Sequence, residues 1–334
     1  MSGERFLVTG AMGCIGAWTV RTLVRQGAAV TAFDLGQSAR RLEQIVTPDE
    51  LAAVEIVRGD ITDLDALTTT LEARDITHVI HLAALQVPFC RADPPRGALV
   101  NVIGTVNVFE AVKRRGPQMA PVVYTSSIGM YAADDVDPGT GRLATDARAH
   151  PHNHYGVYKL ANEGNARVYW LEDGIPSVGL RPMIVYGVGR DQGMTSGPTK
   201  AIVAAVLGRR YTVSFSNTTL FQYAEDAAHM LIAASRSGAS GASVFNMPGT
   251  MVGAADLVAA IEAAVPDARG LIDAEPVSLP FPGEIDHDGI ETLGELPLTP
   301  FETGVSESVA IYRALAASGR LDADLHGLEA VAAT

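Results

Sequence analysis

Short apolar runs alternate with longer amphipathic stretches through the first half of the chain. The apolar runs predict buried strands at residues 5–9, 29–33, 54–57, 77–81, 122–125 and 177–180. The stretches between them predict helices at residues 14–26, 63–73, 94–115 and 155–172. Strands and helices that alternate in this way form a parallel sheet covered on both faces. The pattern therefore predicts an α/β fold built on a doubly wound parallel sheet.

The pattern becomes less regular after residue 181, where glycine and proline are frequent. Helices are predicted at residues 195–207, 256–265 and 302–317, and an irregular surface segment at 276–300. We expect residues 1–182 to form the main domain, which binds a nucleotide. Residues 183–334 should form mainly a smaller α/β lobe for substrate, from which about 219–247 return to the main domain.

Composition narrows the range of functions. The 334 residues include 25 basic and 38 acidic side chains, for a net charge of −13, and basic runs that would neutralise phosphates are missing. We therefore expect neither a nucleic-acid nor a membrane partner. The two cysteines, Cys14 and Cys90, predict no disulfide framework and no metal site. The N-terminus runs directly into a strand pattern, so we expect a cytoplasmic protein.

Three glycines follow the first predicted strand. Gly10, Gly13 and Gly16 have the spacing G-x-x-G-x-x-G and lie just before a predicted helix. Such glycines permit a tight turn, let a pyrophosphate approach the backbone, and let the helix pack close to the strand. The helix N-terminus then presents free N–H groups to phosphate oxygens. An ordinary strand-to-helix turn is the alternative interpretation.

An acidic residue ends the second predicted strand. Asp34 has the position in which a carboxylate accepts hydrogen bonds from the adenosine ribose of NAD and repels the 2′-phosphate of NADP. Arg40 and Arg41 follow and offer a possible phosphate site, but the acid lies nearer the strand end. The sequence therefore predicts NAD, although an acid at this point also often caps a turn.

Two later strand ends carry residues suited to the same ligand. Asp60 and Ile61 follow the third strand and are predicted to approach the adenine. Leu82, Ala83 and Ala84 follow the fourth strand, where small side chains leave space for a ligand against the backbone. Core packing alone would also explain the small residues.

A Y-x-x-x-K pattern supplies candidate catalytic residues. Tyr155 and Lys159 share one helix face, where the ammonium group would favour the phenolate and lower the pKa of the tyrosine. Ser127 follows the fifth strand and would hold a substrate oxygen against Tyr155. Tyr158 is a weaker candidate for the acid–base role, because the residue four positions later is Asn162.

Three histidines precede this helix. His150, His152 and His154 could suggest a metal cluster, but they lie in a predicted loop without a ladder of nearby acids. We interpret them as exposed histidines or as histidines at the rim of a pocket.

These motifs resemble the extended short-chain dehydrogenase/reductase family. The stretches TGAMGCIG, HLAA, VNVIGTVNVFEA, YTSSIGMY, YGVYK and LRPMIVYG occur in that family's order across residues 4–190, and FQYAEDAA at 221–228 matches more weakly. The resemblance implies a Rossmann fold, NAD as cofactor, and Ser127, Tyr155 and Lys159 as the catalytic group. Ser127 is preferred over Ser126 because Ser127 and Tyr131 match the family's S-x-x-x-Y.

Motif positions and resemblance together give a full set of cofactor contacts. The resemblance adds Asn101 and Met183 to the residues named above. The predicted cofactor-binding residues are Gly10, Met12, Gly13, Cys14, Ile15, Gly16, Asp34, Asp60, Ile61, Leu82, Ala83, Ala84, Asn101, Thr125, Ser126, Tyr155, Lys159, Pro182, Met183 and Val185.

Two departures from the family pattern affect the substrate. Members that act on nucleotide-sugars usually carry asparagine where this chain has Ile184, and a basic residue near 216–220, where this chain has none. A diphosphate would lack partners there. We therefore predict a dehydrogenase or reductase for a smaller alcohol or carbonyl, such as a sugar or sugar acid. The predicted substrate contacts are Gln86, Arg91, Ser127 and Arg190.

Two other functions stay open. The chain could be a nucleotide-sugar 4-epimerase or dehydratase that keeps NAD tightly bound, or a non-catalytic regulator that binds NAD. By resemblance, the helices at 94–115 and 155–172 are expected to pair with their copies in a homodimer.

Overall fold

The computed structural model describes residues 3–296, 298–323 and 327–328, and its centre is a seven-stranded parallel sheet. The strand order is β10-β6-β5-β4-β1-β2-β3. Its strands are β1 (Arg5–Thr9), β2 (Ala29–Asp34), β3 (Val54–Arg58), β4 (His78–His81), β5 (Val122–Thr125), β6 (Ser177–Arg181) and β10 (Ala242–Asn246). The order reverses beside β1, because β2 and β3 lie on one side and β4 to β6 on the other. This arrangement confirms the predicted doubly wound α/β fold.

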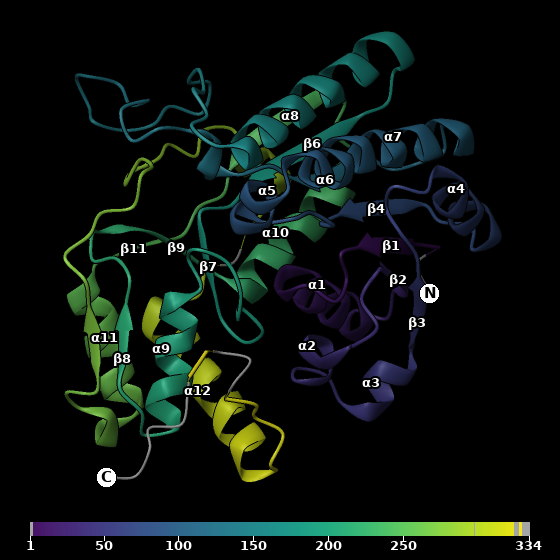
Figure 1. Cartoon of the computed structure of the whole chain (residues 1–334). Helices are drawn as coiled ribbons and strands as arrows, with labels where there is room; N and C mark the ends of the chain where they lie inside the picture. The colour runs from purple at the N-terminus through teal and green to yellow at the C-terminus, as the bar shows by residue number, and fades with distance from the viewer. Residues whose placement is uncertain (1–2, 297, 324–326, 329–334) are drawn as a thin grey trace.

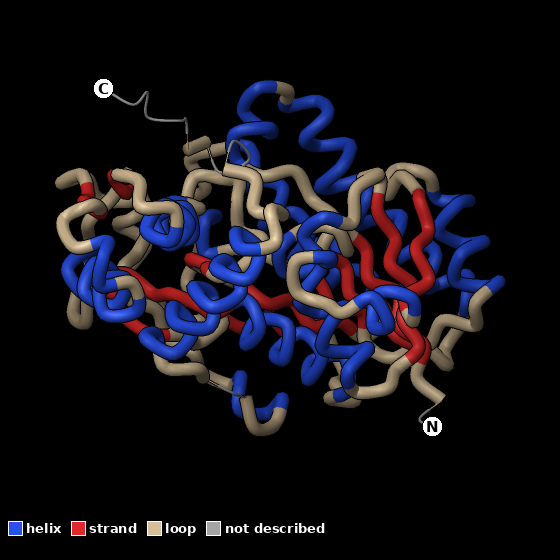
Figure 2. The backbone as a smooth tube through the Cα atoms, turned by 90° about the horizontal axis from the view of Figure 1, so that it is seen from below, coloured by secondary structure: helices blue, strands red, loops and turns tan. Residues whose placement is uncertain are grey.

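Helices cover both faces of this sheet (Figures 1 and 2). One face carries α4 (Leu64–Ala73), α7 (Gly104–Arg115) and α8 (His154–Asp173), and the other carries α1 (Cys14–Arg25) and α10 (Ala224–Arg236). Successive strand residues face opposite cores: Phe6 and Val8 pack with α1 and α10, whereas Leu7 packs with α4 and α7. This explains why the strands are continuously apolar in sequence.

The predicted helix at 94–115 has three parts. It begins as α6 (Pro94–Ala98), passes through a π-helical turn at Leu99–Ile103, and continues as α7. Short helices α2 (Arg40–Glu43), α3 (Pro48–Ala52) and α5 (Val87–Ala92) were not predicted. All three are too short to give a clear helical period in sequence.

The second lobe contains two small sheets and three helices. The sheets have the orders β11-β9-β7 and β12-β8. Their strands are β7 (Ile184–Tyr186), β8 (Tyr211–Val213), β9 (Thr219–Tyr223), β11 (Thr250–Val252) and β12 (Ile272–Ala274). The helices are α9 (Gly197–Val206), α11 (Ala254–Ala264) and α12 (Phe301–Ala317). Figure 1 shows these helices grouped away from β1–β3.

The chain returns from this lobe to the main sheet at α10 and β10. Helix α10 packs on α1, and β10 forms a parallel pair with β6 at the edge of the sheet. The segment 276–300 contains a 3-10 turn at Ile290–Leu293 and is otherwise irregular where it is described. Among the described residues, no helix is both long and apolar enough to cross a membrane.

A buried ion pair joins the centre of the molecule. Glu163 on α8 accepts hydrogen bonds from Nε and Nη2 of Arg181, both at 2.8 Å, and a further bond from the Ser126 hydroxyl. Arg181 also donates to the carbonyl of Thr145 and to Oδ1 of Asn246. The pair therefore fixes α8 against the ends of β5, β6 and β10.

Candidate active site

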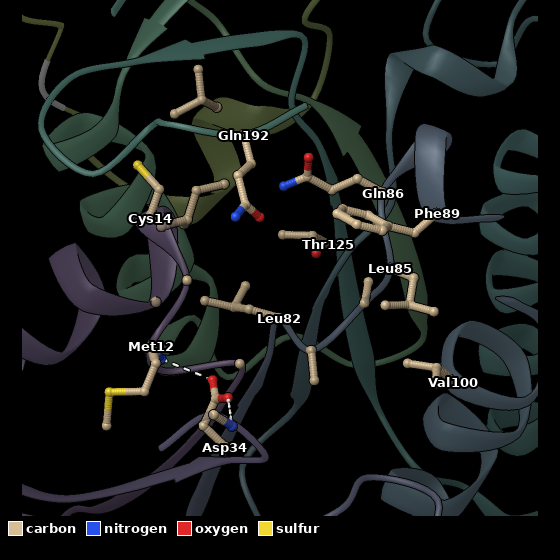
Figure 3. Close-up of a pocket in the computed structure, with 18 of the residues that line it drawn as sticks. Met12, Cys14, Asp34, Leu82, Leu85, Gln86, Phe89, Val100, Thr125 and Gln192 are labelled. Carbon is tan, nitrogen blue, oxygen red and sulfur yellow. Dashed lines mark hydrogen bonds between the residues drawn. The ribbon is translucent and has the colours of Figure 1, made fainter. Parts of the chain in front are cut away.

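A cleft of about 650 Å³ opens at the carboxyl ends of the parallel strands. This is where open α/β sheets bind ligands, beside the point at which strand order reverses. Figure 3 shows Met12 and Asp34 toward one end of the cleft, and Gln86 and Phe89 toward the other. The cleft is therefore long enough to have a nucleotide end and a substrate end.

The cleft brings together most of the residues predicted from sequence. Among the predicted cofactor contacts, those that line it are Gly10, Met12, Gly13, Cys14, Ile15, Gly16, Asp34, Asp60, Ile61, Leu82, Ala83, Ala84, Thr125, Ser126, Tyr155, Lys159, Pro182, Met183 and Val185. Among the predicted substrate contacts, Gln86, Ser127 and Arg190 line it. Two residues, Asn101 and Arg91, do not.

Asn101, a predicted cofactor contact, does not line the cleft. Asn101 is buried in the π-helical turn, where its amide donates to the carbonyl of Leu85 and accepts from the Leu85 N–H. Its own carbonyl accepts from Asn162 Nδ2. Asn101 thus supports the loop after β4 from behind, because both polar atoms of its side chain are already used.

Arg91 also lies elsewhere than predicted. It is exposed on α5, outside the cleft, while Phe89 from the same helix lines the cleft. Residues two apart on a helix point in different directions, and so short a helix has no hydrophobic period that would predict which side chains face the cleft. Arg96 at α6 is a cleft residue that sequence reasoning missed.

The glycine loop is built for close backbone approach. Gly10 has φ of +68°, and a Cβ there would lie 2.6 Å from the backbone N of Ala83. A Cβ on Gly16 would lie 2.2 Å from the carbonyl oxygen of Gly10. Side chains are thus excluded where the loop meets β4 and where α1 begins. The open N-terminus of α1 faces the cleft through Gly13 and Cys14, as a pyrophosphate site requires.

Asp34 is held rigidly at the nucleotide end. Its Oδ2 accepts from the N–H of Met12 at 2.9 Å, and its Oδ1 accepts from the N–H of Gly36 at 2.7 Å (Figure 3). A carboxylate has about four acceptor positions, so capacity remains for ribose hydroxyls. These residues therefore fit the adenosine end of NAD.

Arg40 and Arg41, the alternative phosphate ligands, are already paired. Both bind the buried carboxylate of Asp191, in the loop after β7, at 2.7 and 2.8 Å. No local pattern predicts this contact, because Asp191 lies about 150 residues from both arginines.

The candidate catalytic residues meet at the start of α8. Tyr155 and Lys159 lie in successive turns, and Lys159 Nζ is 5.6 Å from the centre of the Tyr155 ring. Lys159 Nζ also donates to the carbonyl of Thr125 at 2.6 Å. Ser127 follows β5, and its Oγ accepts from the N–H of Gly129 at 3.0 Å. Strand β5 and helix α8 therefore present their polar groups to one end of the cleft.

The electrostatics of Tyr155 differ from the expectation. Burial raises its pKa, while a hydrogen bond from Ser127 and the positive charge of Arg190 oppose that rise. Burial lowers the pKa of Lys159 to about 8. The sequence analysis assigned the opposing charge to Lys159 and named Arg190 only as a substrate contact, because no pattern connects Arg190 to Tyr155, 35 positions away.

The substrate end contains a half-buried cation, Arg190. Arg190 Nη2 donates to Thr195 Oγ1 at 3.2 Å, while its Nε has no partner in the part of the chain that the structure describes. Gln86 Oε1 is likewise buried and unpaired there. Gly193, next to that oxygen, has φ of +97°, a backbone conformation that favours glycine. Both polar groups line the cleft.

The histidines lie in the loop that precedes α8. His150 Nδ1 contacts the carboxylate of Asp135, and His154 stacks near Tyr158. The described residues contain no group of three or more potential metal ligands close enough to hold an ion.

Comparison with known proteins identifies the family. A model described as "NAD dependent epimerase/dehydratase family" matches residues 6–247. This chain belongs to that family. Membership confirms the resemblance seen in the sequence, the prediction of an NAD-dependent enzyme, and NAD as the cofactor.

Individual relatives include epimerases and a dehydrogenase. A UDP-glucose 4-epimerase of Mycolicibacterium smegmatis is 30% identical over 321 residues, covering 92% of this chain and 98% of the relative. The UDP-glucose 4-epimerase of Thermus thermophilus, solved in complex with NAD, is 25% identical with a TM-score of 0.73, covering 93% and 99% of the two chains. A partial consensus L-threonine 3-dehydrogenase shares the fold at 22% identity and a TM-score of 0.80, covering 93% and 100%.

The position of Asp34 predicts selective binding of NAD. We expect NADP to bind more weakly, because its 2′-phosphate would lie against a carboxylate. Asp34→Ala should narrow the difference between the two dissociation constants, measured by calorimetry. Equal or tighter binding of NADP by the unaltered protein would contradict the assignment.

Proposed function

We propose that the protein is an NAD-dependent oxidoreductase that acts on a small alcohol or carbonyl compound bearing an anionic group, such as a sugar acid. One observation carries the proposal: Arg190, a half-buried cation, lines the same cleft as Ser127, Tyr155 and Lys159 and acts electrostatically on Tyr155. An anionic substrate would satisfy Arg190 and bring its reacting oxygen to the tyrosine.

Each residue of this group has a chemical role in the proposal. Bound NAD supplies the hydride acceptor or donor. Ser127 would donate a hydrogen bond to the substrate oxygen, and Tyr155 would take or give its proton. Burial lowers the pKa of Lys159 to about 8, and the lysine carries its positive charge below that pH. In that form it would act together with Arg190, whose charge already opposes the rise in the pKa of Tyr155, and favour a phenolate while the proton is transferred.

A nucleotide-sugar 4-epimerase is the second candidate. It is favoured by the 30% identical UDP-glucose 4-epimerase, which is matched over 98% of its length. The geometry of the cleft supports this reaction less well than it supports the oxidation or reduction of a small compound. Ile184 is buried in β7, and Thr219 is buried with its hydroxyl against the sulfur of Met183. Neither position offers a group to a diphosphate.

Other basic residues of the second lobe do not supply the missing charge to the cleft. Arg209 donates to the carbonyl of Leu328, Arg210 is directed to the carbonyl of Gly270, and Lys200 lies close to Gly327. None of the three lines the cleft.

A homodimer and a reducing, cytoplasmic location complete the proposal. Exposed apolar side chains lie on the π-helical turn and along α8, namely Leu99, Ile103, Val157, Leu160, Val168 and Leu171. A second copy that covered them would bury apolar area. Cys14 and Cys90 are free thiols, as is usual in a reducing compartment. The division near residue 182 into a cofactor domain and a substrate lobe is also part of the proposal.

Replacing Tyr155 tests the acid–base role. Tyr155→Phe removes the transferable proton and keeps the shape of the ring. Turnover should fall by roughly two to four orders of magnitude, the usual contribution of general acid–base catalysis, while NAD binding is largely kept. Turnover and calorimetric NAD binding are the two measurements. Near-normal turnover would move the role to another residue, with Tyr158 the first to test.

A substrate screen separates the two candidate reactions. We expect small hydroxy acids or sugar acids to support NADH formation, which is measured by the absorbance of NADH. We expect UDP and UDP-sugars to bind weakly, as measured by calorimetry. Each missing charge-assisted bond to the diphosphate costs about 1.5–3 kcal/mol. Micromolar binding of UDP would restore the epimerase. Activity with any compound would exclude the non-catalytic regulator.

Two arginine variants provide the matched control for the same screen. Arg190→Gln should raise KM for the active compound with little change in NAD binding. Arg91→Gln removes an equal charge outside the cleft and should leave KM unchanged. An unchanged KM in both variants would show that Arg190 does not bind the substrate.

The dimer is tested on the exposed face of α8. Leu171 has 68% of its side chain exposed, so Leu171→Glu should not disturb the folded monomer. We expect sedimentation velocity to show a dimer for the unaltered chain and a shift toward monomer for the variant, because a charge would be buried in the interface. A monomer at all concentrations of the unaltered chain would refute the proposal.

A further inference from the structure

Asp191 connects the loop after β7 to α2, which follows the strand that ends in Asp34. Its carboxylate accepts from Arg40 Nη2 at 2.7 Å, and from Arg41 Nε and Nη2 at 3.1 and 2.8 Å. The carboxylate is 2% exposed. Burial alone would raise the pKa of Asp191, but the hydrogen bonds and charges of Arg41 and Arg40 outweigh it and lower that pKa. Asp191 is therefore ionised and holds both guanidinium groups in place.

Arg41 lies beside Asp34 as well. Its Nη1 donates to the carbonyl of Met12 at 3.0 Å, while the N–H of Met12 donates to Asp34 Oδ2 at 2.9 Å. The guanidinium and the carboxylate thus bind the two polar atoms of one residue's backbone, and both line the cleft. A phosphate on a ribose bound at Asp34 would lie within reach of Arg41 once that guanidinium was released.

The charges of this group are balanced. Arg40 and Arg41 carry two positive charges, and Asp34 and Asp191 carry two negative charges. A 2′-phosphate would add about two further negative charges, with both nearby cations already engaged. Two arginines close to the ribose site therefore favour NADP only if Asp191 no longer holds them.

We infer that Asp191 is a specificity residue for the cofactor: it withholds Arg40 and Arg41 from a ribose 2′-phosphate and, with Asp34, makes the site select NAD. The inference rests on the proposed placement of the adenosine ribose at Asp34. Asp191 acts through the two arginines, so it is a positioning residue. The competing explanation is that Asp191 only ties the loop to α2, in which case its loss would weaken both cofactors equally.

The test measures dissociation constants of NAD and NADP by calorimetry for the full chain and its variants. Asp191→Asn keeps the shape of the side chain and removes its charge. Added to Asp34→Ala, the Asp191→Asn change should shift the ratio of the NAD and NADP dissociation constants toward NADP by about tenfold or more. That is the contribution of one new charge-assisted hydrogen bond. Replacing Arg40 and Arg41 by glutamine in that double variant should abolish the gain.

Controls separate charge from structure. Asp191→Glu retains the carboxylate, so the ratio of the NAD and NADP dissociation constants should equal that of the same protein without this change. Asp65→Asn removes one charge from a side chain that is 94% exposed and should change nothing. If Asp191→Asn fails to fold, as judged by circular dichroism, Asp191→Ser replaces it as the neutral variant.

The outcomes identify which assignment fails. Equal weakening of both cofactors by Asp191→Asn, or a gain for NADP that persists without the two arginines, would overturn the inference. No response to Asp34→Ala would instead overturn the placement of the ribose.

Discussion

The candidate active site depends on the buried ion pair between Glu163 and Arg181. Arg181 ends β6, Glu163 lies one helical turn after Lys159 on α8, and Ser126 binds the same carboxylate from the end of β5. These contacts fix the strand that carries Thr125 and Ser127 against the helix that carries Tyr155 and Lys159. Two charges removed from water are costly unless their hydrogen bonds are satisfied. Here each partner has several, so the cost of burial is offset at the point where the proposed chemistry needs a fixed geometry.

Because this ion pair holds the elements around the site in place, several charged and polar side chains of the site can lack protein hydrogen-bond partners. Lys159 is buried, and its Nζ donates to a single backbone carbonyl within the described structure. Arg190 Nε and Gln86 Oε1 are buried without protein partners among the described residues. Buried polar atoms usually find partners, and those left open in a cleft are suited to a ligand. Helix α8 is held through Glu163, which pairs with Arg181, and through Asn162, which donates to the carbonyl of Asn101, while Tyr155 and Lys159 line the cleft.

The sequence predicted the fold and the local motifs well because both depend on short-range patterns. Strand β1 was predicted to the residue, and the Gly10–Gly16 loop and the Tyr155–Lys159 spacing each lie within a single turn or helix. The rest depends on contacts between distant segments. No local pattern connects Asp191 to Arg41, or Arg190 to Tyr155. Arg91 lies outside the cleft because the phase of a six-residue helix could not be read from sequence. Asn101, a position carried over from the family, is bonded to the backbone of Leu85, and no sequence pattern indicates that contact.

The loop after β7 connects the two ends of the cleft. Its glycines adopt positive φ at Gly187, Gly189 and Gly193, and between them lie two neighbouring charged residues. Arg190 acts electrostatically on Tyr155, whereas Asp191 binds Arg40 and Arg41 beside the nucleotide end. Because both belong to one short loop held by an ion pair, a shift of that loop would move both side chains together. With the roles proposed for Arg190 and Asp191, the choice of cofactor and the placement of the substrate are coupled through this loop.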